Sequence, residues 1–351
     1  MVSAYLNEVS TAVPDFDIHA KFVEYCPRLL ADRRSQVLFQ RMAQRAQIDH
    51  RFSVLQPGSG TDALDADNFY APGGFPGTRQ RMACYERHAF GLARRALDRL
   101  ELGGTTHLIL TSCTGFYAPG LDLQIVEHYG LAPSVERTLV GFMGCYAAMN
   151  ALKLARHIVR SDSTARVLVL NLELCTLHLQ QNGTLEEMLS FLIFADGCAA
   201  SIVSAQPQGL ELESFSATVL PATHEEITWR IGELGFDMHL SGLVPASIAA
   251  QLPSRLDGML GGRKREDIAH WAIHPGGRSI LDAVRDGARL EERQLFKSRE
   301  VLRRFGNMSS PTIMFVLAAI MDDPADAGAG CAMAFGPGLT VESLRFQTQR
   351  A

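Results

Sequence analysis

Short apolar segments typical of strands alternate along this chain with longer amphipathic segments typical of helices. Such alternation predicts an α/β fold with a parallel or mixed sheet. The chain has 351 residues, 47% of them hydrophobic, so it can bury a large core in one or two domains. Strands are expected at residues 107–113, 165–174, 198–204 and 270–274, and helices at 85–102, 147–160 and 279–288.

A short pattern recurs in the second half of the chain. GCAA at 197–200 precedes LESF at 212–215, and GCAM at 330–333 precedes VESL at 341–344. The recurrence predicts two duplicated halves, residues 1–207 and 208–351. In such an arrangement, the segments around Cys145 and Asn307 occupy equivalent positions.

The two halves are predicted to differ by an insertion. The stretch from Cys145 to the first copy of the pattern is about 29 residues longer than the stretch from Asn307 to the second copy. We expect the extra residues to include 173–194, with the polar segment QQNG at 180–183 as a surface loop.

The charge balance excludes several classes of partner. The formal net charge is −5, and no long basic run occurs. An acidic chain of this kind has no general attraction for nucleic acid or anionic lipid. The longest apolar run, residues 311–321, is much shorter than the ~20 residues that span a bilayer. We therefore expect neither nucleic-acid binding nor membrane insertion.

The cysteines indicate the compartment. Seven are present, an odd number without CxxC spacing, which fits a reducing environment. The first 14 residues lack the charged and then apolar pattern of a signal peptide. These features predict a cytoplasmic protein.

One cysteine is a candidate nucleophile. GCYAA at 144–148 joins an apolar run, 138–143, to an amphipathic run. The pattern places Cys145 at a helix N-terminus, where backbone N–H groups and the helix dipole favour a thiolate. A cysteine after glycine is otherwise more often a small core residue.

Two later segments supply the groups that a reactive cysteine requires. HWAIHPGG at 270–277 places His274 at the end of a strand, and FGNMSSP at 305–311 places Asn307 at the start of a helix. An imidazole can accept the thiol proton, and neutral donors can stabilise an oxyanion or an enolate. Cys145, His274 and Asn307 are therefore the predicted catalytic residues.

The same segments carry a family resemblance. The chain closely resembles bacterial type III polyketide synthases of the chalcone-synthase kind, from about Phe39 to its C-terminus. The most specific likeness is in GFMGCYAA (141–148), HPGGRSILDAV (274–284), FGNMSSP (305–311) and FGPGLTVES (335–343). The resemblance implies a thiolase-like fold of five αβαβα layers, an insertion that builds part of the substrate cavity, and a homodimer.

The resemblance also implies a decarboxylating Claisen condensation. Cys145 takes an acyl group from an acyl-CoA starter, and malonyl-CoA then loses CO2 beside His274 and Asn307, which stabilise the enolate. Phe194 matches a phenylalanine that packs beside the nucleophile and orients the malonyl group. CoA thioesters are the substrates, and no metal or redox cofactor is expected because decarboxylation itself generates the carbanion.

The family binds CoA phosphates with basic residues near the tunnel mouth. Arg41 and Arg45 match two of these positions and lie four residues apart in the helix-like run 35–48. Leu38 stands at a third, so the set is thinner than in plant enzymes.

The implied substrate cavity departs from the plant pattern. Thr114, Ala118 and Cys175 resemble bacterial members that accept long fatty acyl starters, in which a buried alkyl tail gains ~0.8 kcal/mol per methylene. Trp229 and Met238 replace a small residue and a phenylalanine and would shorten another arm. The remaining cavity positions are Cys113, Phe335, Gly336 and Pro337.

An alkylpyrone or alkylresorcinol product follows from this set, and other interpretations stay open. Cys113 and Cys175 also match malonyl-primed synthases of tetrahydroxynaphthalene. A ketoacyl-ACP synthase III-like enzyme of the same fold condenses once and lacks FGPG. A catalytically silent partner subunit is the last alternative. The sequence leaves the starter, the number of extensions and the ring closure undetermined.

Overall fold

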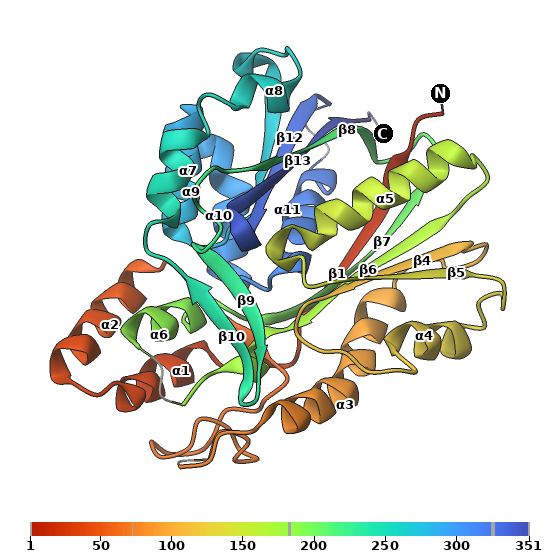
Figure 1. Ribbon diagram of the computed structural model, residues 1–351. Coiled ribbons are helices and arrows are strands. Elements are labelled where there is room, and N and C mark those ends of the chain that lie inside the picture. Colours follow the sequence, from red (N-terminus) through yellow and green to blue (C-terminus); the bar gives the residue numbers. More distant parts are fainter. Residues whose placement is uncertain (1, 72, 182–183, 324–326, 350–351) are drawn as a thin grey trace.

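A nine-stranded mixed sheet runs through the molecule and bends around two central helices (Figure 1). The computed structural model describes residues 2–71, 73–181, 184–323 and 327–349. The strand order is β11-β12-β13-β8-β1-β7-β6-β4-β5. These strands are β1 (Tyr5–Ala12), β4 (His107–Ser112), β5 (Glu136–Gly141), β6 (Val167–Leu174), β7 (Asp196–Ser204), β8 (Leu210–Val219), β11 (Ile268–Ile273), β12 (Ala329–Gly336) and β13 (Thr340–Thr348).

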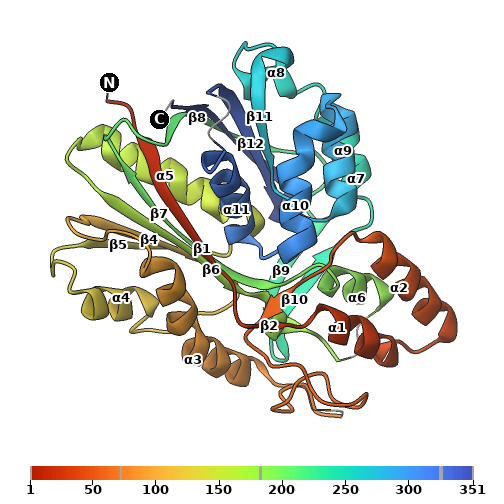
Figure 2. The same cartoon turned by 180° about the vertical axis from the view of Figure 1, so that it is seen from behind.

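Helices form three layers that alternate with the two arms of the sheet (Figures 1 and 2). One outer layer packs on β1, β6 and β7, and the central layer contacts both β6 and β7 on one side and β11 and β13 on the other. The predicted five-layered αβαβα architecture is confirmed. The layers are α3 (Thr78–Leu97) with α4 (Leu121–Tyr129), α5 (Ala147–Ser161) with α11 (Ser310–Met321), and α9 (Arg278–Ala288) with α10 (Phe296–Phe305).

Each helical layer has its own hydrophobic cluster. The central cluster includes Ala148 and Leu152 of α5 and Ile313 and Leu317 of α11, spaced four residues apart on each helix. Alanines on α5 allow the two central helices to lie close together and fix where their N-termini point. Those N-termini carry the candidate site.

Most of the remaining elements lie at one end of the molecule. The hairpin β9–β10 lies beside α6, and α6 packs on α2 (Figure 1). These elements are α1 (His19–Tyr25), α2 (Arg33–Arg45), β2 (Phe16–Asp17), β3 (Phe52–Ser53), α6 (Leu185–Phe191), β9 (Ile227–Gly232) and β10 (Gly235–Leu240). Two other helices lie elsewhere, because α7 (Val244–Gln251) packs on α9 and α8 (Leu256–Leu260) packs on β13.

The two halves have equivalent strands in the same order. The first half contributes β4-β6-β7-β1 to the sheet and the second contributes β11-β12-β13-β8, so α5 and α11 are counterparts. The recurring pattern had aligned β7 with β12, and this alignment is wrong because β7 occupies the place of β13. Both strands are deeply buried, which selects small apolar residues in each. The boundary at 207/208 stays a prediction.

The insertion lies where the sequence placed it. Residues 175–195 connect β6 to β7, whereas residues 337–339 make the equivalent connection between β12 and β13. Gln180 and Gln181 of the expected surface loop are half-buried, and Asn182 and Gly183 lie outside the described residues.

Two further observations concern location. Among the described ranges, no helix is both long and apolar enough to cross a bilayer. All seven cysteines are free thiols. The cytoplasmic location stays a prediction.

Candidate active site

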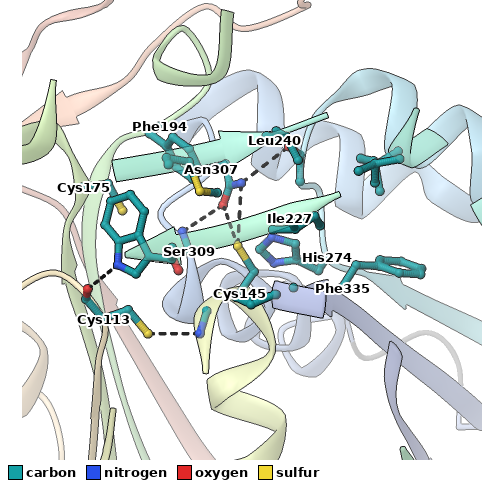
Figure 3. Close-up of a pocket in the computed structure, with 18 of the residues that line it drawn as sticks. Cys113, Cys145, Cys175, Phe194, Ile227, Leu240, His274, Asn307, Ser309 and Phe335 are labelled. Carbon is teal, nitrogen blue, oxygen red and sulfur yellow. Dashed lines mark hydrogen bonds between the residues drawn. The ribbon is translucent and has the colours of Figure 1, made fainter. Parts of the chain in front are cut away.

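Cys145 lies in a tight turn, Gly144–Tyr146, between β5 and α5. Gly144 has φ +68°, and a Cβ atom at this position would meet Cδ of Pro337 at 2.3 Å. Only glycine fits both the conformation and the space. The turn directs the half-buried sulfur away from α5 and into a cavity (Figure 3).

Asn307 faces Cys145 from the N-terminus of α11 (Figure 3). Its Oδ1 accepts a hydrogen bond from the Ser309 backbone N–H at 2.8 Å and faces the Thr312 hydroxyl at 3.4 Å. With the carbonyl held in this way, Nδ2 is the end that can donate, and it lies 4.0 Å from Sγ of Cys145 and 3.5 Å from the Gly276 carbonyl.

His274 follows β11 and completes the group. Its backbone N–H donates to the Met333 carbonyl, which continues the pairing of β11 with β12. The side chain is 1% exposed, and neither ring nitrogen has a hydrogen-bond partner among the described residues. Buried polar atoms usually have partners, so both nitrogens are available to a substrate.

Burial controls the charge of these groups. It raises the pKa of the Cys145 thiol to about 11, although hydrogen bonds from Ser309 and Asn307 act in the opposite direction. Burial also lowers the pKa of His274 to about 3. Burial therefore opposes the thiolate that the helix N-terminus favours, and the two effects act on Cys145 in opposite directions. The thiolate at Cys145 stays a prediction.

A mostly apolar cavity surrounds the three groups. Its walls come from the insertion, from the hairpin β9–β10 and from the loop after β12. Ile227 and Trp229 of β9 pair directly with Leu240 and Met238 of β10, which places all four on one face. The lining residues are Cys113, Thr114, Gly144, Cys145, Cys175, Phe191, Phe194, Ile227, Trp229, Met238, Leu240, Val244, His274, Gly276, Ile280, Asn307, Ser309, Phe335, Gly336 and Pro337.

Comparison with known proteins agrees with this geometry. The N-terminal domain of the chalcone and stilbene synthases matches residues 9–207, and their C-terminal domain matches residues 211–349. The chain belongs to the chalcone and stilbene synthase family. It is a type III polyketide synthase, an acyltransferase whose family uses acyl-CoA and malonyl-CoA.

Curated relatives come from bacteria and plants. The chain is similar to the alpha-pyrone synthesis polyketide synthase-like Pks18 of Mycobacterium tuberculosis, with 36% identity over 293 residues, 78% of this chain and 74% of that protein. It is also similar to the bisdemethoxycurcumin synthase of Oryza sativa, with 34% identity over 260 residues, 68% of this chain and 64% of that protein.

Solved structures match almost the whole chain. PKS-I from the brown alga Ectocarpus siliculosus has a TM-score of 0.88 at 28% identity, over 99% of both chains. The type III domain of Steely1 from Dictyostelium also has a TM-score of 0.88, at 22% identity and the same coverage. These matches confirm the thiolase-like fold of the synthase.

Trp229 lines the cavity of the synthase beside Cys113. Its indole N–H donates to the Cys113 carbonyl at 2.7 Å, and its ring packs edge-on against His178 and Phe236. The indole thus covers the wall formed by Cys113 and Thr114. The sequence predicted a bulky residue here, and the hydrogen bond shows how it is held.

The two additional thiols line the cavity and are removed from water. Cys113 and Cys175 are buried, and removal from water raises the pKa of each well above its usual range. Cys113 Sγ accepts a hydrogen bond from the Gly144 N–H at 3.1 Å. It thereby supports the turn that carries Cys145.

Three predicted site residues lie outside the cavity. Ala118 is exposed, because the chain turns to the surface after Thr114 in the loop between β4 and α4. Ala118 does not line the cavity formed by this single chain, and its role in starter selection stays a prediction. Arg41 and Arg45 are exposed on α2 and also do not line it.

Glu173 is a buried carboxylate that the sequence analysis did not single out. It accepts hydrogen bonds from the Cys113 N–H (2.8 Å), the Thr114 hydroxyl (2.7 Å) and the Ser310 hydroxyl (2.7 Å). Burial raises its pKa to about 7. A lone glutamate in the apolar run 165–174 was the signal that could have revealed it.

Other lining residues were also missed. Ser309 lies in the FGNMSSP segment, from which only Asn307 was predicted as a site residue. Ile227 and Leu240 show the period-two alternation of strands that face a cavity on one side. Phe191 lies at the end of α6 and carried no distinctive signal.

Proposed function

We propose that this synthase loads an acyl group from an acyl-CoA starter onto Cys145, extends it with malonyl-CoA, and releases an alkylpyrone or alkylresorcinol. One observation carries the proposal. The Cys145 thiol, the His274 imidazole and the Asn307 carboxamide donor meet in one apolar cavity. Neither imidazole nitrogen has a hydrogen-bond partner among the described residues.

Loading begins from the neutral pair. As Sγ of Cys145 attacks the thioester carbonyl, His274 accepts the thiol proton. The new carbon–sulfur bond replaces the bond to CoA, and His274 returns the proton to the departing CoA sulfur. Because the base is already unprotonated, this step needs no preformed thiolate.

Extension uses the same donors for a different charge. The bond between the malonyl carboxylate and the α-carbon breaks, CO2 leaves, and the electron pair becomes a thioester enolate. Asn307 Nδ2 and a ring N–H of His274 stabilise the enolate oxygen, and the carbanion attacks the acyl carbonyl on Cys145. The new carbon–carbon bond replaces the bond to Sγ, so a β-ketoacyl-CoA forms and the Cys145 sulfur leaves as a thiolate that takes a proton from solvent. Phe194 supplies an apolar surface that disfavours the carboxylate relative to CO2. The scheme uses no metal and no redox cofactor.

Two supports point to the product class. The similar Pks18 is named for alpha-pyrone synthesis. The cavity of this chain is lined mainly by aromatic and aliphatic side chains such as Phe191, Ile227 and Leu240, which suits an alkyl starter.

The starter reaches the cavity from the α2 side in this scheme. Arg41 and Arg45 are exposed cations that can bind CoA phosphates. Arg45 lies next to the cavity, because its carbonyl accepts a hydrogen bond from Arg278 at the start of α9, the helix that carries the lining residue Ile280.

A homodimer is part of the proposal. β5 forms one edge of the sheet, and its Leu139 is 54% exposed. An exposed edge strand with an apolar side chain is a natural surface for pairing with a second copy. Size-exclusion chromatography with light scattering tests this, and a monomer would contradict it.

The test of function is a starter panel. Pure enzyme is incubated with labelled malonyl-CoA and acyl-CoA starters of increasing chain length, and the products are identified by mass. We expect pyrones or resorcinols that retain the starter. Tetrahydroxynaphthalene from malonyl-CoA alone, a single ketoacyl product, or no CO2 release would each overturn the proposal in favour of one of the three alternatives.

A further inference from the structure

Arg51 is a buried cation directly behind the cavity wall. It precedes β3, is 1% exposed, and has its guanidinium 4.5 Å from the centre of the Phe22 ring. Its Nη1 donates to the carbonyls of Phe191 at 2.8 Å and of Phe194 at 2.6 Å. Nε donates to Nδ1 of His19 at 2.9 Å.

The guanidinium thereby fixes the backbone at the C-terminal end of the insertion, residues 191–194. Phe191 and Phe194 both line the cavity, and their aromatic rings contact each other edge-on. Two carbonyls three residues apart accept from the same nitrogen, so the backbone between them cannot move without breaking a charge-assisted hydrogen bond. The position of the Phe194 ring depends on this turn.

The same arginine also packs against the segment that carries Asn307. Gly306 has φ +69°, and a Cβ atom there would lie 2.8 Å from Cγ of Arg51 and 2.8 Å from the Ile193 carbonyl. The Asn307 N–H donates to the Ile193 carbonyl at 2.8 Å, and the Ala195 N–H donates to the Asn307 carbonyl at 2.9 Å. These two hydrogen bonds join the 191–195 segment to the 306–307 segment beside Arg51.

Within the part of the chain that the structure describes, Arg51 does this without a salt bridge. Its three recorded side-chain hydrogen bonds go to two carbonyls and an imidazole, and Nη2 has no partner among the described residues. Burying an unpaired charge is costly for stability. A side chain with this cost is better explained by what it positions than by what it stabilises.

We propose that Arg51 is a positioning residue for the decarboxylation step, which sets Phe194 and Asn307 relative to each other through the 191–195 and 306–307 segments. This rests on the proposed function, in which those two residues act on the malonyl group. Cys145 and His274 come from other segments, so starter loading does not depend on Arg51.

The experiment separates the two steps in the Arg51→Lys variant. Loading of octanoyl-CoA onto Cys145 is followed by rapid quench and intact mass, and CO2 release is followed with malonyl-CoA labelled in its free carboxyl group. We expect CO2 release to fall about tenfold or more while loading changes less than about threefold, because a displacement of ~1 Å can cost about 10²-fold in rate. Equal changes in both steps would overturn the proposal.

Arg81 provides a matched control. It is also fully buried, also donates to backbone carbonyls, of Pro76 and Leu177, and also has an Nη2 without a partner among the described residues. It contacts neither the 191–195 nor the 306–307 segment in any recorded hydrogen bond. Arg81→Lys should alter both steps by the same factor per folded molecule. A selective loss of CO2 release in this variant would contradict a role specific to Arg51.

His19 gives a milder route if Arg51→Lys does not fold. His19→Leu removes the acceptor of the Arg51 Nε bond, whereas His19→Asn retains an acceptor near the same place. We expect CO2 release to fall about threefold relative to loading in the leucine variant and to recover in the asparagine variant. An equal ratio of CO2 release to loading in the two variants would contradict the inference. A wild-type enzyme that is inactive with every starter would instead contradict the proposed function.

Discussion

The two halves of the synthase both have residues of positive φ just before their central helices, and they place different chemistry there. Before α5, Phe142 and Gly144 have φ of +56° and +68°, and before α11, Gly306 and Ser309 have φ of +69° and +57°. A positive φ strains Phe142 and Ser309, which are not glycines, and such strain is often kept at functional sites. The turn before α5 presents a thiol, and the turn before α11 presents a carboxamide.

The halves differ in the connection that follows the equivalent strands β6 and β12. The first half inserts 175–195, which brings Cys175, Phe191 and Phe194 to the cavity, whereas the second half has the short turn 337–339. The comparison indicates that the duplicated parts supply the reacting groups, while the unequal part supplies the walls that select the substrate.

The largest effect should come from the turn before α5, which carries Cys145. Cys145→Ala removes the atom that accepts the acyl group, so we expect loading and condensation to fall by at least about 10³-fold with the fold retained. Intact mass after incubation with acyl-CoA and thermal melting check the two parts. Wild-type product formation would remove the assignment.

Asn307, before α11, and His274, after β11, should affect decarboxylation. Asn307→Ala removes a donor to the enolate, and His274→Ala removes a second donor and the loading base. We expect CO2 release to fall about 10²–10³-fold in each. Only His274→Ala should also slow loading. Identical loading and decarboxylation defects in both variants would contradict the division of labour.

The β9 wall of the cavity, outside the insertion, should also alter selection rather than chemistry. Trp229→Ala removes the indole that covers Cys113 and Thr114. We expect the ratio of kcat/KM for long over short starters to rise about tenfold, since each additional buried methylene gains ~0.8 kcal/mol. The starter panel measures this ratio. An unchanged ratio would show that Trp229 does not limit the tail.

The contest between burial and helix dipole at Cys145 can be measured directly. With a pKa of about 11, the thiolate fraction, and hence alkylation by iodoacetamide, should keep rising about tenfold per pH unit from pH 7 to 10. Peptide mapping by mass spectrometry gives the rate. A plateau below pH 8 would show a preformed thiolate and reverse this interpretation.

The smallest effect concerns the joint between the halves. Glu173 accepts from Ser310 of the second half, and its pKa is raised to about 7. A carboxyl with a raised folded-state pKa stabilises the fold at pH below about 4.5, and this contribution is lost as the pH rises through 7. The Tm of Glu173→Gln relative to the wild type should therefore increase by a few degrees from pH 5 to pH 8. A constant difference would show that Glu173 does not titrate in this range.

Much of this arrangement was predictable because it is written locally. The strands at 107–113 and 165–174 are uninterrupted apolar runs, and the structure has them at His107–Ser112 and Val167–Leu174. The helix expected at 85–102 instead spans Thr78–Leu97, since Gln80 accepts the Gly77 N–H and extends the first turn. The junctions that carry Cys145, His274 and Asn307 were likewise marked by glycine and proline.

Other features depend on contacts between distant segments. Ala118 matched a cavity position by local likeness, yet its loop turns outward. The recurrence that joined β7 to β12 reflected similar burial rather than equivalent place. Arg51 gave no local signal, and the lone glutamate in the apolar run 165–174 did not indicate its partners, since both residues bond to segments that are far away in the sequence.

The sequence by itself determined the alternation of strands and helices and the glycine- and proline-marked junctions that carry Cys145, His274 and Asn307, because periodicity, turn residues and motif spacing are local properties. Only the tertiary structure decided the burial of His274, the hydrogen bond that holds Trp229 and the contacts of Arg51. Desolvation and packing arise when segments distant in the chain exclude water together, and no single segment contains that information.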